Sequence, residues 1–160
     1  AAENAYAEIT LLLIRFGATV DCIAADDGWT PLHSAVGQGH LGVVDVLLRS
    51  NADVSVRNKA GHAALDIAVS VGKESIIERL LAAGCSVNDS DLEQNHWPPL
   101  HAAALFGQVP AARVLIEHKA EVETPHLPRS PIHSAARHGH TDVVSFLLDH
   151  GGRVNCADAK

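Results

Sequence analysis

Apolar residues recur along the chain in pairs, at the three- and four-residue spacing that marks one face of an amphipathic helix. Four blocks of this kind follow one another, and each begins a few residues after a glycine. The blocks are Val43-Val44 with Leu47-Leu48, Ile76-Ile77 with Leu80-Leu81, Val114-Leu115-Ile116, and Val143-Val144 with Leu147-Leu148. The spacing predicts one helix in each block, with its apolar face buried.

A shorter motif precedes each of these blocks. The segment GWTPLHSAV at 28–36 returns as GHAALDIAV at 61–69, HWPPLHAAA at 96–104 and PRSPIHSAA at 128–136. In the first copy, Thr30 can cap a helix start, and Pro31 suits the first helical position because its φ is fixed and no donor is lost there. Each unit is therefore predicted to contain a turn, a short first helix, a second turn and a longer second helix.

Glycines separate the two predicted helices of every unit, at positions 39, 72, 107 and 139. Glycine readily adopts a left-handed backbone, which ends a helix. Small residues at 35, 68, 103 and 135, all alanine, leave room for helices to approach closely. A single unit of this size cannot cover its own apolar face, so the units are expected to stack.

These motifs closely resemble the ankyrin family, whose pattern is near D-x-x-G-x-T-P-L-H-x-A-A-x-x-G-H-x-x-V-V-x-x-L-L-L-x-x-G-A-D-V-N. The resemblance covers essentially the whole chain. It implies an all-α ankyrin-repeat solenoid of stacked helix-turn-helix units with β-hairpin-like finger loops. We divide a single domain, 1–160, into a partial repeat 1 (1–24), repeat 2 (25–57), repeat 3 (58–92), repeat 4 (93–124), repeat 5 (125–157) and the start of a truncated sixth (158–160).

The register also predicts how the chain begins and ends. Leu11-Leu12-Leu13-Ile14 and Gly17 align with the end of a second helix, which places Ala1-Ala2 inside a first helix. At the other end the chain stops where another T-P-L-H motif would begin. We therefore expect an interior excerpt of a longer array, because terminal repeats carry polar capping faces. Atypical natural caps are the alternative.

The chain departs from the pattern at three places. In repeat 3, Ala63 and Asp66 replace the capping threonine and the histidine, which predicts a weakened helix start. Two extra residues lie near Asp91-Leu92. In the fifth finger, Pro128 cannot supply the positive φ that glycine provides elsewhere, so that tip is expected to differ in shape.

Composition and charge narrow the classes of partner. With 47% hydrophobic and 19% charged residues, the chain can bury a core. Twelve Lys and Arg against nineteen Asp and Glu give a formal charge of −7, which opposes binding to phosphate backbones, so no nucleic-acid partner is expected. No apolar run approaches the roughly 20 residues that span a bilayer, so no direct membrane insertion is expected. Cysteines at 22, 85 and 156 lack C-x-x-C spacing and suggest reduced thiols in the cytoplasm or nucleus.

The sequence contains no residue pattern that indicates a catalytic site or a metal site. Eleven histidines are present, and His133, His138 and His140 lie close together in sequence. The resemblance instead gives the T-P-L-H and G-H histidines structural roles, and zinc would need four converging ligands. Gly37-Gln38-Gly39 lacks the remainder of a nucleotide loop. We expect no enzyme, no cofactor, no metal and no small-molecule substrate.

The resemblance implies that protein partners bind a concave surface made of finger tips and first helices. Carried over position by position, this surface comprises Asp26, Asp27, Trp29, Gln38, His62, Val71, Trp97, Leu105, Phe106, Arg129, Arg137 and His138. Trp97, Val71, Leu105 and Phe106 would form an apolar patch, and buried aromatic residues often dominate interface energies. The alternative is that these side chains, Trp29 among them, pack against neighbouring fingers.

Charge and modification add two further expectations. Asp26 and Asp27 on one finger and Arg129 with Arg137 near the other end predict an acidic-to-basic gradient that would orient a partner, with ordinary solvated charge as the alternative. Asn88 and Asn155 occupy the position that asparaginyl hydroxylation targets in ankyrin proteins, although an asparagine there can simply stabilise the turn between repeats.

The sequence therefore predicts a protein-protein interaction module, an excerpt of a larger scaffold or adaptor that binds a protein or peptide segment. The alternative is a structural spacer within a long array, with no specific ligand of its own.

Overall fold

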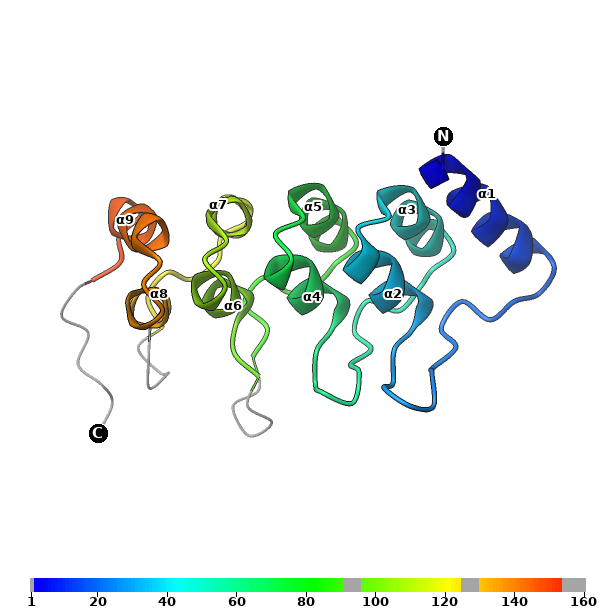
Figure 1. Ribbon diagram of the computed structural model, residues 1–160, viewed down its shortest axis with the longest axis horizontal. Helices are drawn as coiled ribbons and strands as arrows, with labels where there is room; N and C mark the ends of the chain where they lie inside the picture. Colours follow the sequence, from blue (N-terminus) through cyan, green and yellow to red (C-terminus); the bar gives the residue numbers. More distant parts are fainter. Residues whose placement is uncertain (1, 91–95, 125–129, 154–160) are drawn as a thin grey trace. The chain divides into compact units, whose positions relative to one another are not determined.

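A computed structural model describes residues 2–90, 96–124 and 130–153 of the chain, and the elements within these ranges are α-helices (Figure 1). The first helices of the repeats are α2 (Pro31–Gln38), α4 (Ala64–Ser70), α6 (Pro99–Leu105) and α8 (Pro131–Arg137). The second helices are α1 (Ala2–Arg15), α3 (Leu41–Arg49), α5 (Glu74–Ala82), α7 (Val109–Glu117) and α9 (Thr141–Asp149). The predicted all-α architecture of paired helices is confirmed.

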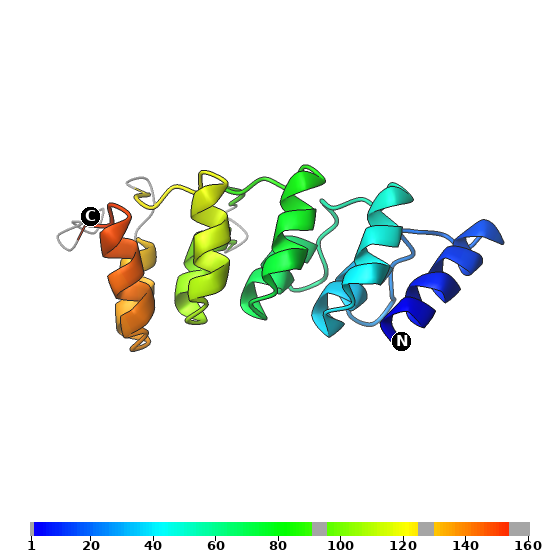
Figure 2. The same ribbon diagram turned by 90° about the horizontal axis from the view of Figure 1, so that it is seen from above.

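The chain forms two compact units, residues 1–68 with 75–85, and residues 69–74 with 86–160. In the first unit, α3 packs against both α1 and α2. In the second unit, α6 packs on α7 and on α8, while α9 packs on α7 and α8. The first helices α6 and α8 are therefore neighbours in one layer, and the second helices α7 and α9 are neighbours in the other (Figure 2).

The predicted periodicity matches the buried faces of the second helices. Their buried residues are Val43, Val44 and Leu47 in α3, Ile76, Ile77 and Leu80 in α5, Ala111, Ala112, Val114 and Leu115 in α7, and Val143 and Leu147 in α9. A core leucine such as Leu47, which is 1% exposed, contributes about 2–5 kcal/mol when compared with alanine. The apolar faces thus bind each helix pair to its neighbours.

Repeat 2 starts and ends as its sequence predicts. Thr30 caps α2 in a reciprocal arrangement, in which the His33 N–H donates to Thr30 Oγ1 at 3.4 Å and the Thr30 N–H donates to His33 Nδ1 at 3.1 Å. Pro31 occupies the first turn. Gly39 then ends the helix with a left-handed φ of 77°.

Helix α1 differs from the prediction for repeat 1. It runs without a break from Ala2, so the expectation that Ala2 lies in a separate first helix is wrong. The physical reason is that Ala5 stands where the other repeats have their turn glycine, and alanine favours continuation of the helix. Ile9 and Leu13, which align with buried Val43 and Leu47, are 53% and 57% exposed.

Three other predicted features lie outside the described residues. They are the insertion near Asp91-Leu92, the finger tip at 125–128, and the beginning of a sixth repeat at 158–160.

Candidate protein-binding surface

Each finger loop of the first unit is a hairpin-like turn closed by a backbone hydrogen bond. The Ala24 N–H donates to Trp29 O at 2.9 Å in one finger, and the Asn58 N–H donates to His62 O at 3.0 Å in the next. Asn58, which is buried, accepts the Ala60 and His62 N–H groups on Oδ1, both at 3.0 Å. The side-chain amide therefore fixes the tip that carries His62.

Consecutive fingers of the first unit are joined through Lys59. Its N–H donates to Asp27 O at 3.0 Å, and its Nζ donates to Ala25 O and Asp26 O at 2.6 and 3.0 Å. The backbone of the Asp26–Asp27 tip is thus engaged in holding the array, while both carboxylates lie in exposed residues.

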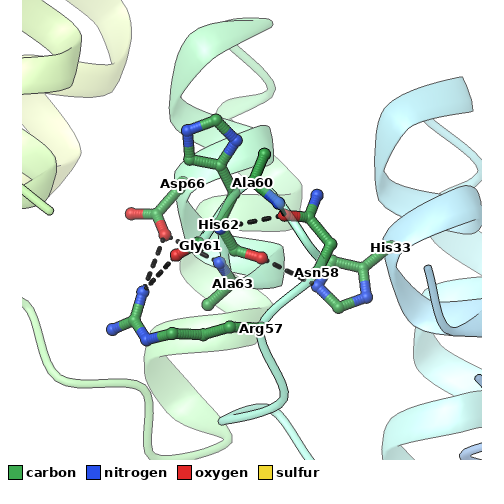
Figure 3. A network of polar contacts seen from close by, with 8 residues as sticks. All are labelled: His33, Arg57, Asn58, Ala60, Gly61, His62, Ala63 and Asp66. Carbon is green, nitrogen blue, oxygen red and sulfur yellow. Dashed lines mark hydrogen bonds and ion pairs between the residues drawn. The ribbon is translucent and has the colours of Figure 1, made fainter. Parts of the chain in front are cut away.

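His33 connects the start of α2 to the following finger (Figure 3). Its Nε2 lies 3.1 Å from His62 O, and because a carbonyl oxygen only accepts, Nε2 carries the proton and Nδ1 is left to accept from Thr30. Burial lowers the pKa of His33 against the opposing effect of its hydrogen bonds to the backbone of His62 and Val56. A neutral histidine is therefore built into the join between repeats 2 and 3.

The start of α4 retains one of the two capping contacts found at the start of α2. Asp66 Oδ2 accepts the Ala63 N–H at 2.8 Å, so a carboxylate replaces the histidine in capping the helix (Figure 3). Arg57 compensates the charge, with Nη1 3.5 Å from Asp66 Oδ2 and donating to Gly61 O at 2.8 Å. Asp66 thus replaces the acceptor that His33 supplies in α2, and the weakened helix start expected from the loss of threonine stays a prediction.

At the other end of the first helices, side chains reach back across successive repeats of the second unit. Gln108 Nε2 donates to Ser70 O at 3.2 Å, and His140 Nε2 donates to Leu105 O at 2.9 Å. Each of these side chains lies over the turn glycine of the preceding repeat. A Cβ on Gly72 would collide with Gln108 Oε1, and a Cβ on Gly107 would lie 2.7 Å from His140 Nδ1. These glycines thus provide both positive φ and space.

This ladder holds two segments of the predicted apolar patch side by side within the second unit. Val71 adjoins Ser70, and Leu105 with Phe106 immediately precede Gly107, so the hydrogen bonds hold their segments side by side. Val71, Leu105 and Phe106 are 41%, 38% and 51% exposed. Their exposure contrasts with the full burial of Ala103 and Ala104 in the same helix. We call Val71, Trp97, Leu105 and Phe106 the apolar surface.

The two tryptophans occupy equivalent positions but have different surroundings. Trp29 lies over Gly37, where a Cβ would come 3.2 Å from its Cζ3 atom. In repeat 4 the position that aligns with Gly37 is Leu105. Trp97 therefore has no glycine in the aligned position on which its ring could pack. Trp97 is half-buried, with its ring 5.3 Å from that of His101. Trp29 therefore packs on the first helix of its own repeat, and its role in binding stays a prediction.

The remaining sequence-predicted residues divide between the units. Gln38 and His62 are exposed in the first unit, and Arg137 and His138 are exposed in the second. The His138 ring donates from Nδ1 to Ser134 O at 2.9 Å and stacks on His140. Arg129 and Asn155 lie outside the described residues.

Asn88 is engaged in a second ladder, at the turns after the second helices. Its Oδ1 accepts the Glu121 N–H at 2.9 Å, as Asp21 accepts from Asp53 and Glu123 accepts from Arg153. The three acceptors each stand four residues after the left-handed residue of their turn, which an alignment of the repeats would have revealed. The observed bonds match the turn-stabilising alternative for Asn88.

Neither metal ligation nor membrane insertion is indicated over the ranges described. No group of three or more His, Cys, Asp or Glu side chains there is arranged to hold a metal ion. Across the same residues, no helix is both long and apolar enough to span a bilayer.

Tandem helix pairs, each turned by a glycine and tied to the next by side-chain ladders, define a helical-repeat protein. A family model described as ankyrin repeats (3 copies) matches residues 1–91 and 65–158, and the chain belongs to the ankyrin-repeat family. Ankyrin repeats are generally protein-interaction modules and typically not enzymes.

Relatives with this repeat are proteins of varied function. The chain is 36% identical over 159 residues to a putative palmitoyltransferase ZDHHC13 of Danio rerio, covering 97% of this chain and 24% of that protein. It is 31% identical over 136 residues to the human transient receptor potential cation channel subfamily A member 1, covering 83% and 12%. A probable E3 ubiquitin-protein ligase XBOS32 of Oryza sativa subsp. japonica is 28% identical over 156 residues, covering 78% and 31%. The chain thus spans less than a third of each of these relatives.

Proposed function

We propose that this chain is a protein-interaction module that docks a protein segment on the apolar surface of its second unit. The observation that carries the proposal is the exposure of Leu105 and Phe106 at helix-end positions where repeat 2 has Gly37 and Gln38. The scaffold folds with either pair, so the larger apolar side chains are not required for stacking. Exposed apolar side chains clustered on one face are typical of interaction sites.

Polar residues flank this surface and extend the candidate site. Arg137 and His138 follow it along the second unit, and Arg129, Asp26, Asp27, Trp29, Gln38 and His62 complete the set expected from the family resemblance. Because Trp29 covers Gly37, it contributes less to binding in this proposal than Trp97. The acidic-to-basic gradient and the hydroxylation of Asn88 or Asn155 stay predictions.

The module would recruit its partner to an activity carried by other parts of a longer protein, as a scaffold or adaptor. The relatives support this role because their names describe a palmitoyltransferase, a ubiquitin-protein ligase and a cation channel, while the shared segment is the repeat array. The chain itself would perform no catalysis and would hold no cofactor. Its partner would be a protein met inside the cell rather than a nucleic acid, a lipid or a small molecule.

The test is affinity capture with a double variant, Trp97→Ala with Phe106→Ala, against the native chain. Leu148→Ala is the matched control, since Leu148 is 41% exposed on α9 and lies outside the apolar surface. We expect the double variant to lose specific partners, each truncation costing on the order of 2 kcal/mol, while the control retains them. Circular dichroism should show equal helicity in all three chains.

An unchanged set of partners for the folded double variant would contradict docking at this surface. It would instead support a spacer segment. Loss of the same partners in Leu148→Ala would show that capture depends on exposed apolar residues in general rather than on this site.

A further inference from the structure

We propose that the segment docked on the apolar surface carries an acidic residue about three positions from its apolar anchor, with that carboxylate bound by Arg137. The inference rests on the proposed function and specifies the chemistry of the partner. It follows from the order of side chains that the second unit presents along its first helices.

The ladder of hydrogen bonds sets this order. Gln108 joins the end of α4 to the turn after α6, and His140 joins the end of α6 to the turn after α8. The helix ends therefore follow one another as Val71, then Leu105 with Phe106, then Arg137 with His138. An apolar stretch is followed by a cation on the next repeat.

The cation is available for an external carboxylate. Arg137 is exposed, and within the described ranges it forms no ion pair, whereas Arg57 pairs with Asp66 and Arg79 with Asp45. Helices α6 and α8 contain no acidic residue that could neutralise it. An arginine guanidinium suits a carboxylate partner because it can donate two parallel hydrogen bonds.

The spacing of the helices converts this order into a sequence motif. Packed neighbouring helices lie roughly 8–10 Å apart, and an extended strand advances about 3.3 Å per residue. A segment crossing from α6 to α8 would therefore have the residue that contacts Phe106 and the residue that contacts Arg137 about three positions apart. A lysine or arginine at that position of the partner would be repelled.

The chemistry can be tested by selecting a phage-displayed library of random twelve-residue peptides on the full 160-residue chain. Parallel selections use Phe106→Ser, Arg137→Glu and the control Lys119→Glu, which makes the same charge change at an exposed turn residue. Lys119 already has a positive φ of 71°, and glutamate adds no new backbone constraint there. Circular dichroism verifies that every variant is folded.

We expect the native chain and Lys119→Glu to enrich peptides with an apolar residue and Asp or Glu about three positions away. Replacing that acid by its amide should weaken binding to the native chain about tenfold. The same replacement should strengthen binding to Arg137→Glu, because it removes the repulsion between two carboxylates, and a double-mutant cycle measures the difference. Phe106→Ser should enrich neither feature.

The two hypotheses fail in different ways. If the native chain enriches nothing beyond Phe106→Ser, docking on the apolar surface itself is contradicted. If apolar anchors are enriched without an acid, or if Arg137→Glu selects the same acidic peptides, docking stands and the acidic partner is contradicted.

Discussion

The starts and the ends of the first helices differ in what their residues do for the fold. At their starts, different residues do the same job: Thr30 with His33 caps α2, whereas Asp66 with Arg57 caps α4. At their ends, the turn glycine is retained while the pair before it changes from Gly37-Gln38 to Leu105-Phe106. The starts are interchangeable solutions to one structural problem, and the ends are free to differ in surface chemistry.

The difference has a physical cause. The first N–H groups of a helix lack partners within the helix and are costly to bury unsatisfied, which favours the acceptors at the starts of α2 and α4. Within the residues that the structure describes, helices α6 and α8 begin without a side-chain cap hydrogen bond. In repeat 4, Leu105 and Phe106 before the turn glycine are exposed, whereas Trp29 covers Gly37 in repeat 2. We therefore expect an exchange of these side chains to change recognition with little effect on folding.

The largest expected loss of stability comes from substituting the turn glycine Gly107, which follows the variable pair at the end of α6. Gly107→Ala combines a positive φ of 70° with a Cβ that would lie 2.7 Å from His140 Nδ1, so it should destabilise the chain by about 2–4 kcal/mol. Gly139→Ala, with φ of 76° and nothing within 4 Å, should cost only about 1–2 kcal/mol. Urea unfolding compares them, and equal losses would refute a packing role for Gly107.

The start of α4 provides the next test. Asp66→Ala removes the acceptor of the Ala63 N–H and should cost about 1–2 kcal/mol. Asp66→Asn retains an acceptor and loses only a partly exposed ion pair with Arg57, so it should cost less. Thermal unfolding measures both, and an asparagine as damaging as alanine would mean that the ion pair matters more than the cap.

Gly37→Leu gives repeat 2 the residue of repeat 4. The new side chain must displace Trp29, whose ring lies 3.2 Å from the added Cβ, while leucine gains about 1 kcal/mol of helix propensity over glycine. We expect net stability within about 1 kcal/mol of the parent and a red shift of Trp29 fluorescence, measured with Trp97→Phe as background. Unchanged emission would show that the environment of the Trp29 ring does not require glycine at position 37.

The smallest effect concerns pH. Since burial lowers the pKa of His33 in the folded chain below the ordinary histidine value of 6.5, the unfolded chain binds more protons in this range. The contribution of neutral His33 is present above pH 6.5 and is lost as pH falls through the lower folded pKa. His33→Gln, which keeps an acceptor for Thr30, should flatten the fall in stability between pH 7 and 5. A slope equal to that of the native chain would assign the acid sensitivity to other groups.

Much of the fold could be predicted because its determinants are local. The positions of the helices within one repeat follow from the apolar spacing, from Thr30 and from the turn glycines. Where Ala5 replaces the turn glycine, helix α1 continues without a break. The contact of Asp66 with Arg57 could not be predicted from the motif, because Arg57 lies nine residues upstream, at the end of the preceding repeat.

The candidate site was only partly predictable. Trp29 and Trp97 have the same motif position, and what distinguishes them is the residue eight positions later, Gly37 or Leu105. The ladders from Gln108 and His140 join residues 35 or more positions apart, so their geometry required the folded chain.

The central claim is that the pair before the turn glycine determines binding and not folding. The most direct measurement gives repeat 4 the pair of repeat 2, as Leu105→Gly with Phe106→Gln, and determines affinity for a captured partner by calorimetry beside the melting temperature. We predict a loss of affinity of about 30-fold or more, with stability lowered by only about 1 kcal/mol for the added glycine. Affinity within about twofold of the native chain would contradict the account.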